Sequence, residues 1–265
     1  MGSDSRERST RPGARDPALV EALHARTGVV CMVGAGGKKS TMYRLAQAHD
    51  GRVAVTTTVH IPPFPEWLDA APVVADAGDL EAMVLAQAVR RSRLAYATRT
   101  DKQGRFGGVA PQTVARLHQQ AQFDVTLVKA DGARRRQIKG PGGRAPIVPD
   151  ETATVVAAVS AQTVGRPLDQ RVAHYMENIA ALLGVRPGEI LTSRHIAQTL
   201  AAYLQGDWLP GGAHLVPLVN MAEDRESRRA AQEIAATLLD LMPRVSRVVI
   251  AHMLGDDPLV AVVQR

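Results

Sequence analysis

A short stretch rich in glycine and lysine carries the strongest chemical signal in this sequence. It reads Gly34-Ala35-Gly36-Gly37-Lys38-Lys39-Ser40-Thr41 and follows an apolar run at residues 29–33. Amphipathic residues come after it, which predicts a strand, a turn and a helix in that order. Such a turn points backbone N–H groups and a helix N-terminus at one place, and a lysine adds positive charge there. We therefore expect these eight residues to bind the phosphates of a nucleotide.

The register of this stretch against the usual phosphate-binding loop has two interpretations. If Lys38 is the phosphate lysine, the pattern requires glycine at Met32 and serine or threonine at Lys39. If Lys39 is the phosphate lysine, Ser40 takes the magnesium position, but the pattern then requires glycine at Val33 and Lys38. We favour Lys38, because it directly follows the glycines, with Ser40 as a metal ligand. The remaining alternative is a glycine-rich turn without a ligand.

Two further predicted strands end in groups that suit a nucleotide and a metal ion. Thr57 and Thr58 follow a buried run and could contact a γ-phosphate, although they could also simply complete the strand. Asp131 follows another buried run, and its carboxylate could hold Mg²⁺ directly or through water. Gly132 would let a ligand approach the backbone closely, whereas the alternative for this pair is an ordinary Asp-Gly turn.

A run of arginines comes directly after Asp131. Arg134, Arg135 and Arg136, together with Lys139, lie in a segment at 133–149 that is rich in proline and glycine. This segment is long for a connection in a compact domain and is therefore expected to be a functional loop. The cations could bind the nucleotide or an anionic second substrate, while the simpler alternative is a solvated cluster of charges.

Asn220 is the last candidate, at the end of an apolar run near the C-terminus. GTP-binding proteins have Asn-Lys-x-Asp at such a place, whereas here methionine and glutamate replace the lysine and the aspartate in the stretch 220–223. Recognition of guanine is thus not specified, but a contact between Asn220 and the base is expected. The nucleotide is ATP or GTP.

The elements that must position these residues alternate along the chain. Helices are expected at 16–24, after the glycine turn, at 79–91, from Pro111, at 168–183, at 195–204 and from 224 to 241. Strands are expected at 29–33, 52–55, 73–74, 94–97, 124–128, 154–159, 215–219, 248–250 and 259–263. This alternation predicts an α/β fold with a doubly wound, mainly parallel sheet, in which ligands bind at the C-terminal ends of the strands. Residues 1–15 are expected to form a disordered tail and residues 16–265 a single domain.

Composition excludes several classes of protein. The chain has 265 residues, of which 45% are hydrophobic, and no apolar run approaches the length that a bilayer requires. A net charge of +6 could suit nucleic acid, but only 3% of residues are aromatic, which makes a groove that stacks bases improbable. The single cysteine rules out a disulfide framework, and the histidines show no metal-ligand spacing. We expect a cytoplasmic protein that binds neither membranes nor nucleic acid.

The ordered set of motifs resembles the YqeC family over roughly residues 17–265. The matching blocks are Val33–Lys38, Val55–Ile61, Ala130–Arg136, Lys139–Pro141, Pro146–Pro149, Gly165–Leu168 and Val219-Asn220. Members are described as accessory proteins of selenium-dependent molybdenum hydroxylases. The resemblance implies a three-layer fold like that of P-loop nucleoside triphosphatases, and partners that include a molybdenum cofactor or a molybdenum hydroxylase. The chain departs from the family pattern at Lys39, often threonine, and at Lys129, often glutamate.

Together these observations predict an accessory protein that binds a nucleotide and Mg²⁺ and acts in maturing a molybdenum hydroxylase. Lys38 and Asp131 are the candidate catalytic residues for a nucleoside triphosphate hydrolase, and Ser40 and Asp131 are the candidate metal ligands. A small-molecule kinase for an anionic substrate and a cofactor-binding chaperone that does not hydrolyse the nucleotide are the alternatives. The expected nucleotide contacts are Gly34, Ala35, Gly36, Gly37, Lys38, Lys39, Ser40, Thr41, Thr57, Thr58, Gly132, Arg134, Arg135, Arg136 and Asn220.

Overall fold

A computed structural model describes residues 15–142 and 144–265. The tail expected at 1–15 lies outside the described residues except for Arg15. No helix among the residues described combines the length and the apolar character that a membrane span requires.

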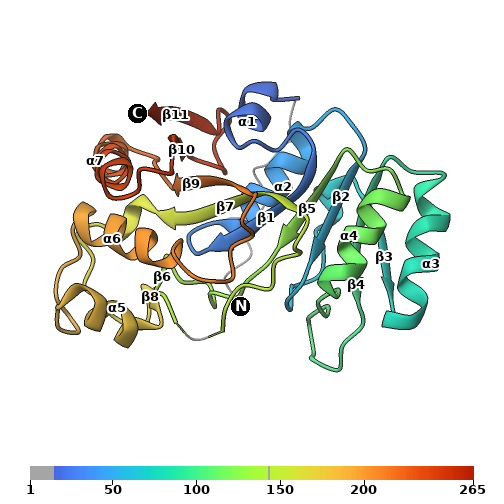
Figure 1. The fold of residues 1–265 in the computed structure, drawn as a ribbon, viewed down its shortest axis with the longest axis horizontal. Coiled ribbons are helices and arrows are strands. Elements are labelled where there is room, and N and C mark those ends of the chain that lie inside the picture. The colour runs from blue at the N-terminus through green and yellow to red at the C-terminus, as the bar shows by residue number, and fades with distance from the viewer. Residues whose placement is uncertain (1–14, 143) are drawn as a thin grey trace.

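A sheet of nine strands runs through the molecule (Figure 1). The strand order is β11-β10-β9-β7-β1-β5-β2-β4-β3, and every neighbouring pair is parallel except β10 and β11. Two short strands, β6 and β8, pair separately. The bounds are β1 Gly28–Gly34, β2 Val53–Thr57, β3 Ala71–Ala75, β4 Arg93–Thr98, β5 Val125–Lys129, β6 Ile138–Lys139, β7 Thr152–Ser160, β8 Ala173–His174, β9 His214–Asn220, β10 Arg247–Ala251 and β11 Leu259–Gln264. The expected mainly parallel sheet is confirmed.

Helices cover both faces of this sheet. The helices are α1 Pro17–Ala22, α2 Lys38–Ala48, α3 Ala77–Ala88, α4 Pro111–Gln120, α5 Met176–Leu183, α6 Ser193–Tyr203 and α7 Arg225–Leu241, with short 3₁₀ turns η1 Glu66–Leu68 and η2 Ala161–Thr163. Apolar residues of α1 and α2 pack in one buried cluster, and those of α3, α4, α6 and α7 pack in another. Successive residues of β1, β4, β7 and β10 alternate between the two clusters, as expected for strands that are buried on both faces. The structure is therefore a doubly wound α/β arrangement in three layers.

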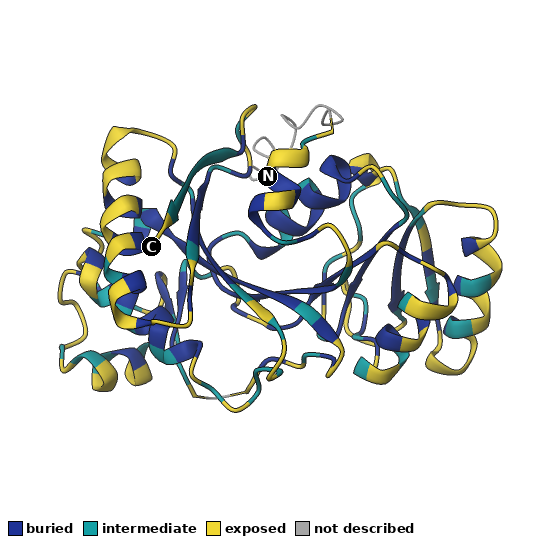
Figure 2. Cartoon of the chain, turned by 45° about the horizontal axis from the view of Figure 1, so that its top comes forward, coloured by how far each residue is buried: buried dark blue, intermediate teal, exposed yellow. Residues whose placement is uncertain are grey.

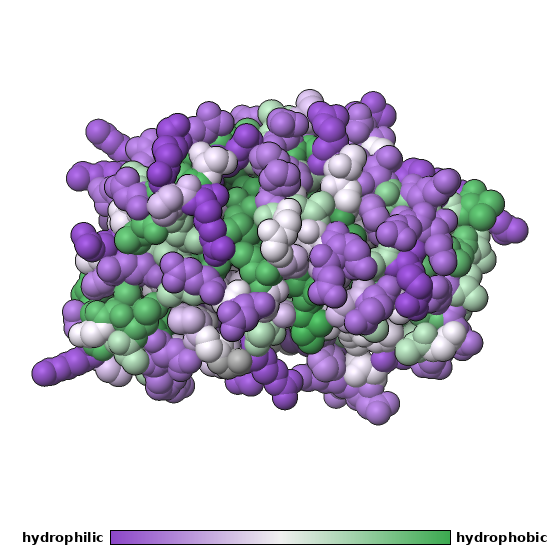
Figure 3. Space-filling model, in the orientation of Figure 1, coloured by the Kyte–Doolittle hydropathy of each residue, from purple (hydrophilic) through white to green (hydrophobic). Residues whose placement is uncertain are grey.

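The distribution of polar side chains agrees with these layers. Figure 2 shows buried strands between helices whose outer surfaces are exposed. On the face drawn in Figure 3, hydrophilic residues dominate and apolar residues occur in separate small groups. Burial of the two apolar clusters is thus the main contribution to the stability of the fold.

Local signals explain where several helices begin. The carboxylate of Asp16 accepts a hydrogen bond from the backbone N–H of Leu19 (2.9 Å), and Pro17 occupies the first position of α1. Asp224 and Ser227 form a reciprocal capping box at the start of α7. These caps satisfy N–H groups that have no partner inside the helix.

The expected helix at 168–183 is wrong in its first half. Helix α5 begins only at Met176, and the segment before it forms a turn and strand β8. The Asp169 carboxylate accepts hydrogen bonds from the backbone N–H groups of Arg171 (2.7 Å) and Val172 (2.8 Å). Such a side-chain turn competes with a helix for the same backbone groups, which is why apolar spacing alone was misleading here.

Candidate functional site

The glycine turn and the Asp131 segment lie side by side at one edge of the sheet. Strand β1 ends at Gly34 and its parallel neighbour β5 ends at Lys129, with Met32 opposite Lys129 in the register. Strand β2, which ends at Thr57, is the next neighbour of β5. The C-terminal ends of three adjacent parallel strands therefore bring together the residues that the sequence predicted to act together.

The conformation of the glycine turn requires glycine. Gly34, Gly36 and Gly37 have φ angles of +83°, +75° and +120°, which side chains rarely adopt. A Cβ atom at Gly34 would lie 2.4 Å from the carbonyl oxygen of Ala158, and one at Gly36 would lie 2.5 Å from the backbone nitrogen of Ser160. The turn thus packs tightly against the end of β7 and leaves no room for a side chain.

Protein acceptors already use the first N–H groups of the turn. Ala35 N–H donates to the carbonyl of Ala158 (2.8 Å), and Gly36 N–H donates to that of Arg136 (3.2 Å). The Gly34 N–H donates to the carboxylate of Asp131 (3.1 Å). Helix α2 begins at Lys38, so the N–H groups that a helix leaves without intrahelical partners come after these three residues. The first turn of α2 is therefore the better placed part of the stretch for a phosphate.

Asp131 is the centre of a buried network of charged and polar side chains. Its Oδ1 atom lies 2.8 Å from the ammonium of Lys38, and its Oδ2 atom lies 2.8 Å from that of Lys139. The hydroxyl of Tyr203, at the end of α6, donates to Oδ2 at 2.6 Å. Lys38 also donates to the carbonyl of Gly34, so the network joins the glycine turn to β5.

Electrostatic effects in this network have a clear direction. Burial raises the pKa of Asp131, but the neighbouring Lys38 and Lys139 outweigh burial and lower it to about 2. Burial lowers the pKa of Lys38, and Asp131 opposes that shift. The pKa of Tyr203 is raised by burial and by the negative charge of Asp131, so the phenol keeps its proton and acts as a donor. One carboxylate thus faces two lysines, an excess of cationic groups over anionic ones.

Sequence reasoning missed part of this network. Lys139 was assigned to an anion-binding loop, but its side chain is 1% exposed and points at Asp131. Its Nζ atom lies 5.9 Å from the ring centroid of Tyr175 and 5.2 Å from that of Tyr203. Tyr203 was only one residue of a predicted helix. No local pattern marks it, because its partner Asp131 is 72 positions away.

Lys129 is a second buried lysine beside this network. Its ammonium donates to the carbonyl of His60 (2.9 Å), in the loop after β2. Burial lowers its pKa to about 7, and the positive charge of Lys38 contributes to the shift. A lysine with a lowered pKa therefore occupies the position at which the family pattern often has glutamate.

Thr57 ends β2 and Thr58 follows it, both next to this site, and their hydroxyls contact protein groups. The Thr57 hydroxyl lies 2.7 Å from the carbonyl oxygen of Val59 and 2.9 Å from that of Lys129. Thr58 donates to the carbonyl of Ile147 at 2.6 Å. The Thr58 bond holds the end of the 133–149 segment near the end of β2. A contact of either hydroxyl with a γ-phosphate stays a prediction.

The arginine run covers the glycine turn with its backbone. Arg134 and Arg135 are exposed and have positive φ angles of 45° and 62°, whereas Arg136 is half-buried. The Arg136 carbonyl is the acceptor for Gly36 N–H described above. Gly132 is exposed, and a Cβ atom added there would meet no atom within 4 Å. Contacts of these four residues with a nucleotide stay predictions.

Asn220 supports the glycine turn from the end of β9. Its amide nitrogen donates to the carbonyl of Gly36 (2.9 Å), and its amide oxygen accepts from the N–H of Met253 (3.1 Å). A Cβ atom at Gly37 would lie 2.1 Å from this amide nitrogen. Asn220 thus fixes the shape of the turn, and its expected contact with a base stays a prediction.

The donor set permits a metal ion only together with further ligands. No group of three histidine, cysteine, aspartate or glutamate side chains in the described part of the chain could hold a metal. Asp131 Oδ1 is buried and accepts no directed hydrogen bond from a described residue, although Lys38 lies near it. Ser40 is half-buried in the first turn of α2. One carboxylate and one hydroxyl suit Mg²⁺, which usually keeps waters and binds through substrate phosphates.

Comparison with known proteins identifies relatives of this chain. The family model described as "YqeC protein" matches residues 30–177. A protein of Escherichia coli (strain K12), described as "Uncharacterized protein YqeC", is 31% identical over 252 residues. The aligned region covers 91% of this chain and 93% of that protein. The matched family segment contains the glycine turn, the threonines and Asp131.

Proposed function

The chain belongs to the YqeC family, and we propose that it binds a nucleoside triphosphate, ATP or GTP, at the glycine turn and Lys38. The phosphates would contact the first turn of α2, including the N–H groups of Lys38 and Ser40. In this proposal Asn220, Asp131 and the end of β7 hold the turn in its shape. The nucleotide-bound protein would act as an accessory protein in maturing a selenium-dependent molybdenum hydroxylase.

The surplus of positive charge around Asp131 carries this proposal. Lys38 and Lys139 both lie 2.8 Å from the one carboxylate, and all three side chains are at most 6% exposed. Buried charges are costly unless they are paired, so this cluster favours an additional anion. Lys38 is the first residue of α2, where the helix dipole is positive. A helix N-terminus together with a lysine is an effective site for phosphate.

Lys38 is the lysine free to change partners within this cluster. When its ammonium turns to a phosphate, Asp131 keeps Lys139, the Tyr203 hydroxyl and the Gly34 N–H as partners. The carboxylate then remains neutralised, and its Oδ1 atom is released. Lys38 can therefore bind phosphate without leaving Asp131 unpaired.

Mg²⁺ enters this proposal as part of the nucleotide complex. Asp131 Oδ1 and the Ser40 hydroxyl are the protein oxygens that would hold it, with phosphate oxygens and waters completing the coordination. When bound, the ion would neutralise charge on the phosphates. Lys129, beside Lys38, could accept or donate a proton near neutral pH.

Access to the site requires movement of the covering segment. Lys38 and Asp131 are both buried, and the backbone of Arg136 lies on the glycine turn. We infer that the segment 133–149 opens to admit the ligand and that its arginines then face the phosphates. Arg136 is half-buried and is the first candidate for such a contact.

Phosphorus NMR of the parent protein with ATP or GTP and Mg²⁺ tests the chemistry. Release of inorganic phosphate would identify a hydrolase. A new phosphoester in the presence of an anionic acceptor would identify a kinase, and saturable binding without either product would identify a cofactor-binding chaperone. Absence of saturable binding for both nucleotides would overturn the proposal.

The maturation role is supported by the resemblance to the YqeC family. Native mass spectrometry of freshly purified protein tests it separately, because a co-purifying molybdopterin or hydroxylase would add a defined mass. A mass that corresponds to a nucleotide alone, in cells that make an active molybdenum hydroxylase, would count against this part of the proposal.

A further inference from the structure

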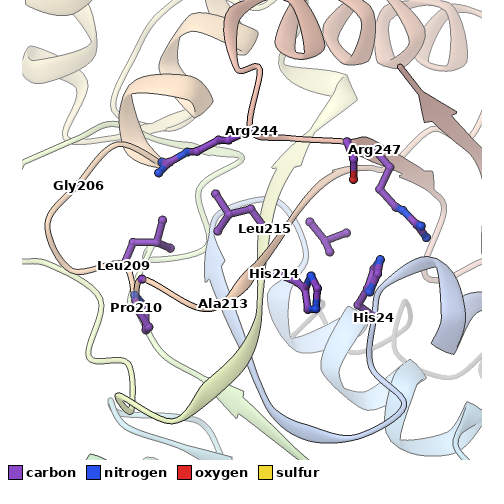
Figure 4. A pocket seen from close by; sticks show the side chains of 12 residues that line it. His24, Gly206, Leu209, Pro210, Ala213, His214, Leu215, Arg244 and Arg247 are labelled. Carbon is purple, nitrogen blue, oxygen red and sulfur yellow. The ribbon is translucent and has the colours of Figure 1, made fainter.

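A cavity lies at the opposite edge of the sheet from the glycine turn (Figure 4). Its volume is about 510 Å³, within the range of pockets that bind organic molecules. The loop after α1, the connection from α6 to β9 and the connection from α7 to β10 surround it. Strand β9 begins at this cavity with His214 and ends at the glycine turn with Asn220, roughly 20 Å away for a strand of this length. The cavity is therefore a separate site.

The charged groups around this cavity are all basic. Arg244, Arg247, His24 and His214 line it, and no aspartate or glutamate does. Neither arginine is within ion-pair distance of a carboxylate in the part of the chain that the structure describes. Arg244 donates to the carbonyl of Leu204, whereas the Nε atom of Arg247 is buried without an acceptor among the described residues. Two guanidinium groups without a counter-charge favour an anionic ligand.

The two histidines stack on one another at the wall of the cavity. Their ring centroids are 4.9 Å apart and the ring planes differ by 24°, so the imidazoles stack. Figure 4 shows this pair below Arg247, with Arg244 across the cavity near Leu209. Leu209, Pro210 and Leu215 add apolar surface. A ligand with a ring could lie along this surface while its acidic group faces the arginines.

His24 has a left-handed backbone conformation. Its φ angle is +47°, in the left-handed region that costs roughly 1 kcal/mol for a side chain. The hydroxyl of Thr154 donates to its carbonyl (2.9 Å), which fixes the loop after α1. This conformation ends α1 in a Schellman motif, in which Ala25 N–H donates to the carbonyl of Val20 (2.9 Å) and His24 N–H donates to that of Glu21 (3.1 Å), and it places the imidazole on the cavity wall.

We propose that this cavity binds a small organic anion, whose phosphate or carboxylate group faces Arg247 and Arg244 and whose planar ring packs on the outside of the stacked pair His24 and His214. This site is independent of the nucleotide site. The ligand class is a phosphorylated or carboxylated ring compound, because the cavity combines guanidinium groups that lack a carboxylate partner with a stacked imidazole pair and apolar side chains.

NMR of the histidine ring signals, with phenyl phosphate and benzoate as probes, tests this site. Variants His24→Gln and His214→Gln assign the two signals. We expect both signals to shift saturably with at least one probe, and the tighter probe to identify the acidic group. The double variant Arg244→Gln/Arg247→Gln should weaken binding at least tenfold, whereas Arg91→Gln, at an exposed position outside the cavity, should not.

Three results would overturn the proposal. These are no saturable shift with either probe, equal affinity in the parent and the folded double arginine variant, and binding of inorganic phosphate as tight as that of phenyl phosphate. Circular dichroism shows whether the variants are folded. Lys38→Met should leave this binding unchanged, so a failure here and a failure at the nucleotide site are distinguishable.

The dependence of affinity on pH provides a further signature. Burial lowers the pKa of His24, the positive charges of Arg247 and His214 add to this shift, and Glu21 on α1 opposes it. A bound anion would raise the pKa of His24, so binding should strengthen as the pH falls from about 8 to about 6. Affinity that is constant over this range would contradict a ligand anion beside His24.

Discussion

The ammonium of Lys139 lies 2.8 Å from the Oδ2 atom of Asp131, and each of these side chains is only 1% exposed. Lys38 occupies the other oxygen of the same carboxylate. Asp131 is therefore bound from two directions before any ligand arrives. In the proposed function, Lys139 holds the carboxylate throughout, and Lys38, at the start of α2, turns to a phosphate.

Replacing Asp131 with asparagine should destabilise the fold strongly. Asp131→Asn leaves Lys38 and Lys139 buried without a negative partner, and breaking such a pair costs about 3–5 kcal/mol. Urea unfolding measures the loss. The control is Asp76→Asn, which removes an exposed ion pair to Arg99 and should change stability little. A similar small loss for both variants would contradict a structural role for the Asp131 network.

The same network should make stability depend on pH in acid. Asp131 has a pKa of about 2 in the folded protein, below its usual value of 3.8. Its stabilising contribution is therefore complete above about pH 4 and is lost as the pH falls towards about 2, roughly 2 kcal/mol in all. The difference in unfolding free energy between the parent and Asp131→Asn should shrink over this interval. A constant difference would refute the assigned charge state.

Lys129 should make the free energy of unfolding increase with pH just above neutrality, because its pKa is lowered in the fold. Its pKa is about 7 when folded and 10.5 in its ordinary state, so the unfolded chain binds more protons above pH 7. Unfolding free energy should therefore rise with pH between about 7 and 9 in the parent relative to Lys129→Met. Parallel curves for the two proteins would show that Lys129 stays protonated in the fold.

The glycine turn should tolerate no side chain at Gly36. Gly36→Ala places a Cβ atom 2.5 Å from the backbone nitrogen of Ser160 at a φ of +75°, so both stability and nucleotide affinity should fall. Gly78→Ala, on α3, is the matched control, because a Cβ atom there meets nothing within 4 Å and its φ is not positive. Equal nucleotide affinity in the two variants would show that the shape of the turn is unimportant for binding.

Nucleotide should protect the arginine run from trypsin. Arg134 and Arg135 are exposed in a segment that we propose opens and closes over the site. Addition of ATP or GTP with Mg²⁺ should slow cleavage there, while cleavage at the exposed pair Arg90 and Arg91 after α3 should not change. Cleavage rates at 134–136 that are the same with and without ligand would leave the run as a solvated surface.

The sequence could predict that the candidate residues lie along one edge of the sheet, because this depends only on the strands running parallel. Gly34, Thr57 and Asp131 each follow an apolar run, and the ends of adjacent parallel strands must meet at one edge. The partners within the site could not be predicted in this way. Tyr203 reaches Asp131 from the far end of α6, and this contact depends on how α6 packs on the sheet.

The cavity lined by His24 and His214 could not be predicted from the sequence, for the same reason. His24 and His214 stack although 190 positions separate them in the chain, and neither belongs to a recognisable motif. Asn220 is an intermediate case, since its place at the end of a strand was expected. Its hydrogen bond to Gly36 depends on β7 lying between β1 and β9, an order that periodicity does not encode.

Calorimetric titration of the parent, Lys38→Met and Lys39→Thr with ATP and GTP in the presence of Mg²⁺ tests the central claim most directly. Methionine keeps the buried stem of Lys38 but removes a charge-assisted contact of about 1.5–3 kcal/mol, so affinity should fall at least tenfold. Lys39→Thr should bind as tightly as the parent. Equal affinity in Lys38→Met and the parent, or loss of binding in Lys39→Thr alone, would contradict the assignment of Lys38 as the phosphate lysine.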